Sequence, residues 1–149
     1  MKSIFRFCFL LPWGQKWLTF KTLFWVLYFL FIMKCLPNKY LTRCLGVKLA
    51  ENLNTLPVNT VFIHQVRRAI FRVRALLPID KYCLISALTA KKLLAQHHIP
   101  NTLYLGVAKD EQEGGIKAHA WLRCGNVIVI GGGKELSRYT VISPFFEDK

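Results

Sequence analysis

Two runs of strand-forming residues lie only two residues apart, and this spacing constrains the fold more than any other feature of the chain. The runs are AHAWLRC at 118–124 and VIVIG at 127–131, with Gly125-Asn126 between them. A two-residue link between such runs predicts an antiparallel hairpin, and glycine in its first position favours a type II′ turn. A regular ladder from that turn would form three pairs: Cys124 with Val127, Trp121 with Ile130, and His119 with Gly132.

Helical patterns precede these strands along the chain. Apolar runs bounded by capping and breaking residues predict four helices: 15–36, 38–45, 60–77 and 81–97. Residues 47–59 are predicted to be a loop, and TLYLGVA at 102–108 a strand. Helices followed by antiparallel strands predict an α+β fold. The length suits one domain over 1–149, with a helical basic half at 1–79 and the central helix and sheet at 80–149.

The first predicted helix is strongly hydrophobic. Its uncharged run, TLFWVLYFLFIM at 22–33, is shorter than the roughly 20 residues that a membrane-spanning helix needs. Pro12 and Lys16 interrupt the segment before it, so a cleavable signal is not predicted. We therefore expect the apolar surface of helix 15–36 to be mostly buried against the rest of the protein. The alternative is peripheral membrane contact through the tryptophans and nearby lysines: Trp13, Trp17 and Trp25.

Basic residues are concentrated in the first half of the chain. The net charge is +13, and residues 1–79 hold twelve Lys or Arg against one acid, Glu51. Helix 60–77 has one apolar stripe at helical spacing: Phe62, Val66, Ala69, Ile70, Val73, Leu76 and Leu77. Its four arginines lie mainly off that stripe, which is typical of a solvated basic face: Arg67, Arg68, Arg72 and Arg74. Nucleic-acid binding is not predicted, because the chain shows neither a recognisable motif nor aromatic residues interleaved with these arginines.

One of the five cysteines occupies a special position. The set is odd and contains no C-x-x-C pair, which argues against a disulfide framework and indicates a reducing, cytoplasmic compartment. Asp80 is a good N-cap for helix 81–97, so Cys83 falls in the first turn. Free backbone N–H groups and the positive end of the helix dipole favour a thiolate there. The other four cysteines fit the description of small buried hydrophobes.

His119 lies where both strands of the predicted hairpin carry only small residues beside it. Alanines flank it in its own strand, and glycines 131–133 are expected opposite. The small neighbours leave room for a helix end or a substrate backbone. Cys83 on a helix N-terminus and His119 on a strand behind it form the pair that thiolate–imidazolium catalysis needs.

Three segments carry a resemblance to a known family. These are Cys83-Leu84 opening a helix, Leu105-Gly106-Val107 in a strand, and the box Ala118-His119-Ala120-Trp121. They resemble the transglutaminase-like cysteine proteases, in particular the leader peptidase (B protein) of lasso-peptide biosynthesis. The N-terminal half, with its hydrophobic helix and CLPNKYLTRCLG, is similar as well, so the likeness covers nearly the whole chain.

The resemblance implies a transglutaminase-like, papain-like α+β fold in which the central helix carries the cysteine and a small antiparallel sheet carries the histidine. It implies that Cys83 is the nucleophile and His119 the general base and acid. The implied reaction is hydrolysis of one peptide bond, which frees the core of a ribosomally made precursor peptide from its leader. A separate lasso cyclase would then close the ring.

The chain departs from the family pattern in two respects. A third group, usually Asp, should orient the histidine, but glycines stand at the expected positions. Asn126, Glu135 or a backbone carbonyl remain as candidates. Full-length relatives also carry a winged-helix domain that recognises the leader. No such pattern occurs in residues 1–79, so a separate leader-recognition protein is the expected partner.

No cofactor and no metal are assigned. Cys83, Cys124 and His119 lack the spacing of a zinc site, and GGGKE lacks the spacing of a phosphate-binding loop. Two function classes follow from the sequence. The first is a cysteine endopeptidase that matures a lasso-type precursor. The alternative is a non-catalytic basic membrane-surface or scaffold protein with a degenerate transglutaminase-like fold.

Overall fold

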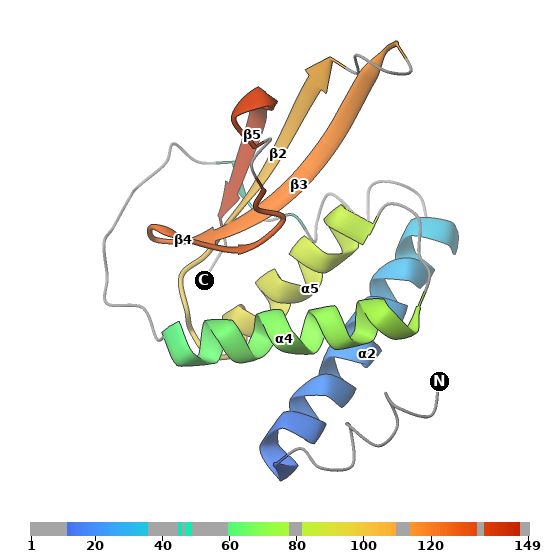
Figure 1. Cartoon of the computed structure of the whole chain (residues 1–149), viewed down its shortest axis with the longest axis vertical. Helices are drawn as coiled ribbons and strands as arrows, with labels where there is room; N and C mark the ends of the chain where they lie inside the picture. The colour runs from blue at the N-terminus through green and yellow to red at the C-terminus, as the bar shows by residue number, and fades with distance from the viewer. Residues whose placement is uncertain are drawn as a thin grey trace.

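Three helices pack beneath one antiparallel sheet (Figure 1). The computed structural model describes residues 12–35, 45, 47–48, 60–77, 82–109, 114–133 and 136–146. The helices are α2 (Trp13–Cys35), α4 (Thr60–Leu76) and α5 (Tyr82–Ala95). A continuous hydrophobic core runs from α2 through α4 and α5 to the sheet. The predicted α+β architecture is confirmed.

Helix α5 is the central element. It packs against α2, α4 and β3 (Ile116–Cys124), and ten of its 14 residues are buried. The helix ends in a turn at 96–98, where His98 has a φ of 52°. The N–H of His98 donates to Ala95 O, and that of Ile99 donates to Leu94 O. This pair of bonds is a Schellman motif, which satisfies carbonyls that the helix leaves free.

Helix α4 buries only part of the predicted apolar stripe, because Phe62 and Leu77 at its two ends are half-buried. Its buried residues recur at helical spacing: Ile63, Val66, Ala69, Ile70 and Val73. Leu76, which was predicted to belong to the stripe, is 47% exposed, and Ile63 contributes to the core in addition. The arginines do not form one solvated face, because Arg72 donates hydrogen bonds to Gln15 Oε1 and Thr19 Oγ1 on α2.

The prediction that the apolar surface of α2 is mostly buried is wrong. Only one side packs on α4 and α5, through four residues: Thr22, Val26, Phe29 and Ile32. Large apolar side chains on the opposite side are exposed, including Trp13 at 85% and Phe20 at 62%. The helix is long and apolar enough to cross a membrane by length and composition, and 28% of its most apolar window is buried.

The sheet has five strands in the order β1-β5-β2-β3-β4. Its other strands are β1 (Val47–Lys48), β2 (Thr102–Lys109), β4 (Val127–Ile130) and β5 (Thr140–Phe146). The strand predicted at 102–108 is confirmed, whereas β5 was missed and β1 falls in a predicted loop. Of the predicted helix at 38–45, the structure describes Leu45 alone. The predicted N-cap Asp80 lies outside the described residues.

The hairpin begins as predicted and then changes register. Cys124 pairs with Val127, and Gly125 has a φ of 52° while Asn126 keeps a negative φ, as a type II′ turn requires. Arg123 then pairs with Ile128, but Leu122 pairs with Ile130. The predicted pairing of Trp121 with Ile130 is therefore wrong, because a bulge places an extra residue, Val129, in β4. The ladder ends at Ile130, so His119 and Gly132 are not a ladder pair.

The connection from β4 to β5 covers the outer face of the sheet. The strand order carries the chain from Ile130, beside β3, to Thr140, beyond β2, and the described part of this connection includes a short 3₁₀ helix, Leu136–Arg138. On β3, the core residue Ala120 points toward the helices, so His119 and Trp121 share the other face. Trp121 is only 5% exposed there. This crossing places the connection against His119.

Candidate active site

The first turn of α5 holds Cys83. The helix begins at Tyr82, so Cys83 is its second residue, and its side chain is half-buried. The first backbone N–H groups of a helix have no partner within the helix, and they point toward any group at its N-terminus. Cys124 lies fully buried at the end of β3, and this burial raises the pKa of its thiol to about 12. Cys124 therefore stays protonated near neutral pH.

The carbonyl oxygen of Gly131 lies 2.7 Å from Nε2 of His119. A carbonyl oxygen can only accept a hydrogen bond, so Nε2 carries the proton and donates it. In the neutral ring, Nδ1 then has the free lone pair. The hydrogen bond thus selects the tautomer whose Nδ1 can act as a base.

Gly131 cannot be replaced without moving the backbone. Its φ of 78° is in the left-handed region that favours glycine. A Cβ atom at this position would lie 2.5 Å from the carbonyl oxygen of Ala120 and 2.8 Å from Cα of Trp121. The close approach to β3 holds the Gly131 carbonyl beside the His119 ring.

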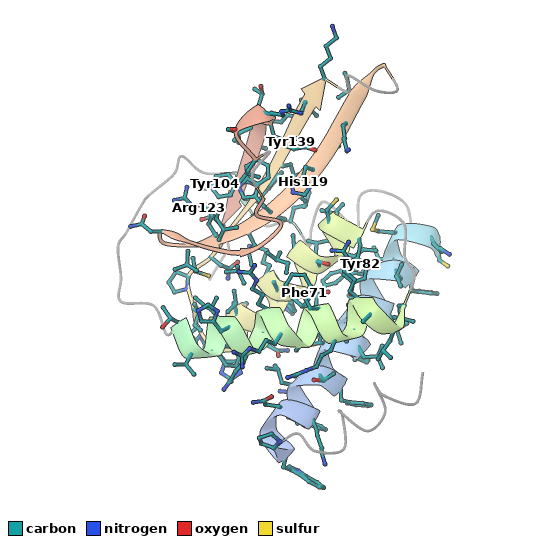
Figure 2. All side chains as sticks on the ribbon, viewed as in Figure 1. Phe71, Tyr82, Tyr104, His119, Arg123 and Tyr139 are labelled. Atoms are coloured by element: carbon teal, nitrogen blue, oxygen red, sulfur yellow. The ribbon has the colours of Figure 1, made fainter. Side chains whose placement is uncertain are left out.

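Aromatic rings pack around His119 (Figure 2). The Trp121 ring lies 6.1 Å from the imidazole at an interplanar angle of 21°, and the Tyr139 ring lies 5.0 Å away at 35°. Trp121 also stacks on Tyr104 at 5.5 Å. Gly106, which pairs with His119, leaves the space for this packing, since a Cβ there would lie 2.9 Å from Cη2 of Trp121. These contacts limit rotation of the imidazole.

Cys83 and His119 line the same cavity, whose volume is about 600 Å³. Residues of α4, α5, β4 and the glycine segment complete its wall: Ile70, Phe71, Arg74, Tyr82, Ser86, Ile130, Gly131, Gly132, Gly133, Leu136 and Tyr139. Arg74 carries the one permanent charge among these lining residues. The cavity is open, mainly apolar and basic in character.

Tyr82 is an apolar wall of this cavity rather than an acid or a base. Its hydroxyl donates a hydrogen bond of 3.3 Å to the carbonyl oxygen of Ile70. Burial raises the pKa of Tyr82 to about 12, although the nearby Arg74 guanidinium acts in the opposite direction. That guanidinium lies 5.5 Å from the centre of the Tyr82 ring. Sequence reasoning missed Arg74 and Tyr82 at the site, because only the packing of α4 on α5 brings them there.

A second hollow of about 480 Å³ adjoins the first, and Leu136 and Tyr139 line both. Tyr104, Trp121, Arg123 and Asn126 belong to the second hollow. Asn126 is therefore placed away from the cavity that holds Cys83 and His119. Glu135, the other side chain considered as a partner of His119, lies outside the described residues.

The described part of the chain contains no Asp or Glu side chain, because all eight acids of the sequence lie outside it. Among the described residues, the partner of His119 Nε2 is the backbone carbonyl of Gly131, one of the three alternatives left by the sequence. Within the same described ranges, no group of three His, Cys, Asp or Glu side chains could hold a metal ion.

Comparison with known proteins agrees with this arrangement. A family model described as the transglutaminase-like superfamily matches residues 28–144, which is more than half of the chain and includes Cys83 and His119. The chain belongs to the transglutaminase-like superfamily. Cysteine peptidases are among the members of this superfamily. No curated protein and no solved structure matches the chain.

Proposed function

We propose that this transglutaminase-like protein is a cysteine endopeptidase in which Cys83 is the nucleophile and His119 the general base and acid. The observation that carries the proposal is that the cavity at the start of α5 is lined by both side chains, while the His119–Gly131 bond leaves Nδ1 free. A nucleophile and an oriented imidazole in one cavity are the minimum that thiolate catalysis requires.

The reaction proceeds in two stages. Nδ1 of His119 takes the proton of the Cys83 thiol, and the thiolate attacks the carbonyl carbon of the scissile peptide bond. Backbone N–H groups at the start of α5 stabilise the oxyanion that develops. The C–N bond breaks as the imidazolium donates its proton to the leaving amine. Water, activated by Nδ1, then hydrolyses the thioester and restores the thiol and the neutral ring.

The Gly131 carbonyl performs part of the role that a carboxylate performs in a complete triad. It fixes the tautomer and the ring orientation of His119. A neutral carbonyl stabilises a cation less than a carboxylate does, because charge-assisted hydrogen bonds are roughly twice as strong as neutral ones. A thiol tolerates this weaker help better than a serine hydroxyl would, since it ionises more readily.

The substrate in this proposal is the precursor of a lasso-type peptide, cleaved once between leader and core. The resemblance of the Cys-Leu, Leu-Gly-Val and Ala-His-Ala-Trp segments supports this choice. The two adjoining hollows offer room for an extended peptide segment, and the guanidinium of Arg74 suits an acidic side chain. A separate protein would present the leader, and a lasso cyclase would act on the released core in the cytoplasm.

Reconstitution tests the proposal. The full-length protein would be incubated with a lasso-type precursor peptide and a leader-binding protein from the same organism, and the products identified by mass spectrometry. One cut between leader and core is expected, and it should require the leader-binding protein. An intact precursor under these conditions, with a folded protein, would contradict the peptidase assignment.

The alternative is a non-catalytic scaffold with a degenerate fold. The observation in its favour is that His119 Nε2 bonds to the backbone carbonyl of Gly131, where a complete triad would offer a side chain. The two functions differ in covalent chemistry, because only the peptidase forms a thioester at Cys83. Trapping with a peptide aldehyde directed at that thiol separates them: modification at Cys83 alone supports the peptidase, and no modification supports the scaffold.

A further inference from the structure

One face of α2 is both apolar and exposed. The inference drawn from it does not depend on the proposed peptidase activity. Seven large side chains lie on it, each at least 42% exposed: Trp13, Trp17, Phe20, Phe24, Leu27, Tyr28 and Phe31. Their spacing of three, four or seven residues places them on one side of the helix, opposite the buried Val26 and Phe29. Figure 1 shows α2 on the far side of the helical layer from the sheet. We call this surface the aromatic face.

The aromatic face is bordered by positive charge. At about 100° per residue, Lys16 and Lys34 fall on one margin of the face and Lys21 on the other. The Lys21 ammonium lies 5.7 Å from the centre of the Trp17 ring. Residues 12–35 contain no Asp or Glu, so no negative charge on this helix opposes an anionic partner. The combination of aromatic residues at the surface and lysines beside them is typical of helices that lie in the membrane interface.

We propose that the aromatic face of α2 docks the protein onto an anionic lipid surface. Tryptophan and tyrosine favour the boundary between headgroups and acyl chains, because their rings are apolar and their N–H or O–H groups remain hydrated. The flanking lysines contact lipid phosphates, and their charge makes the attachment depend on anionic lipid. The protein binds reversibly, with its catalytic cavity outside the bilayer.

The packing of α2 favours lying on the membrane over crossing it. The helix has 23 residues, so its length alone would allow it to span. Spanning would remove Val26, Phe29 and Ile32 from the core, where each is at most 3% exposed. It would also break the hydrogen bonds from Arg72 to Gln15 Oε1 at 3.1 Å and to Thr19 Oγ1 at 3.4 Å.

Vesicle co-sedimentation of the full-length protein tests this proposal. The probes are vesicles of phosphatidylcholine alone and vesicles in which one third is phosphatidylglycerol. We expect binding to the anionic vesicles that weakens as salt is raised. The triple variant Phe20→Ser, Phe24→Ser, Phe31→Ser should bind at least tenfold more weakly, because it removes apolar area from the interface. Lys21→Gln and Lys34→Gln should each cost about fivefold on anionic vesicles.

Ile116→Ser is the matched control, since Ile116 is 79% exposed but lies on β3. It should bind vesicles as the native protein does. Failure of the native protein to bind, or equal binding by the native and triple-variant proteins, would overturn the proposal. A dimer that the phenylalanine variant dissociates, without vesicle binding, would identify the face as a protein interface and overturn it as well. None of these outcomes bears on whether the protein cleaves a soluble precursor.

Discussion

His119 and Gly131 are joined by a hydrogen bond of 2.7 Å from Nε2 to the backbone carbonyl. The bond depends on the absence of a side chain at 131, because a Cβ atom there would collide with the Ala120 carbonyl at 2.5 Å. The glycine thus brings a main-chain acceptor to a place where the superfamily pattern leads us to expect an acidic side chain. The predictions below test what this arrangement does.

Replacing His119 should nearly abolish cleavage, while replacing Asn126 should not. General acid–base catalysis contributes about 10²–10⁴-fold to rate, so His119→Ala should lose at least that much. Asn126→Ala should lose at most a few-fold, because Asn126 lines the second hollow and not the cavity of Cys83. Glu135→Ala is expected to behave in the same way. Single-turnover cleavage rates of the folded variants are the measurement, and a collapse in Asn126→Ala or Glu135→Ala would identify a side-chain partner instead of the carbonyl.

Gly131→Ala should lower both stability and activity, whereas Gly133→Ala should change little. Alanine at 131 must adopt a left-handed conformation at a cost of about 1–2 kcal/mol and must also push the segment away from β3. A Cβ atom at Gly133 meets nothing within 4 Å. Thermal melting and single-turnover rates distinguish the two variants. A folded Gly131→Ala protein with the native rate would show that the carbonyl does not orient His119.

The three helices, the strands β2, β3 and β4 that follow them, and the pairing at the turn could be predicted because they depend on local chemistry. Glycine at 125 sets the turn, and the apolar stripe of α4 sets which side packs. The bulge at Val129 could not be predicted, because every residue of the run VIVI is apolar and a shift of one residue leaves the pattern unchanged.

Burial of α2 was predicted from its hydrophobicity, which does not say how many neighbours are available to cover it. Its aromatic face is exposed because the packing of α4 and α5 occupies only one side of the helix. Within the site, Cys83 and His119 were predicted from position and neighbours. Arg74 was not, since its place in the cavity depends on how α4 crosses α5.

Alkaline pH should destabilise the protein through Cys124. The pKa of this thiol is raised from 9.0 to about 12 in the folded state. Between these two values the unfolded chain releases the proton and the folded chain keeps it, so the free energy of unfolding falls as pH rises. Cys124→Ala should flatten this decline, whereas Cys35→Ala should not, because Cys35 is exposed. Denaturant unfolding at pH 8, 9 and 10 measures how the free energy of unfolding changes with pH. The same decline in the native protein and in Cys124→Ala would refute the raised pKa of Cys124.

His98→Gly should stabilise the fold. His98 occupies the left-handed position that follows α5, with a φ of 52°, where glycine avoids the strain that other residues carry. We expect a gain of about 1 kcal/mol in the free energy of unfolding. Gln96→Gly is the control, because residue 96 has a negative φ, and it should be neutral or destabilising. A loss of stability in His98→Gly would show that the imidazole makes a contact worth more than the strain.

Cleavage of the precursor by Cys83→Ala, compared with Cys124→Ala and the native protein, tests the central claim most directly. Single-turnover rates would be followed by mass spectrometry, with circular dichroism to confirm folding. The account predicts that Cys83→Ala folds and loses several orders of magnitude in rate, because the covalent route is gone. Cys124→Ala should keep most of the native rate. An unchanged rate in folded Cys83→Ala would contradict the assignment of Cys83 as the nucleophile.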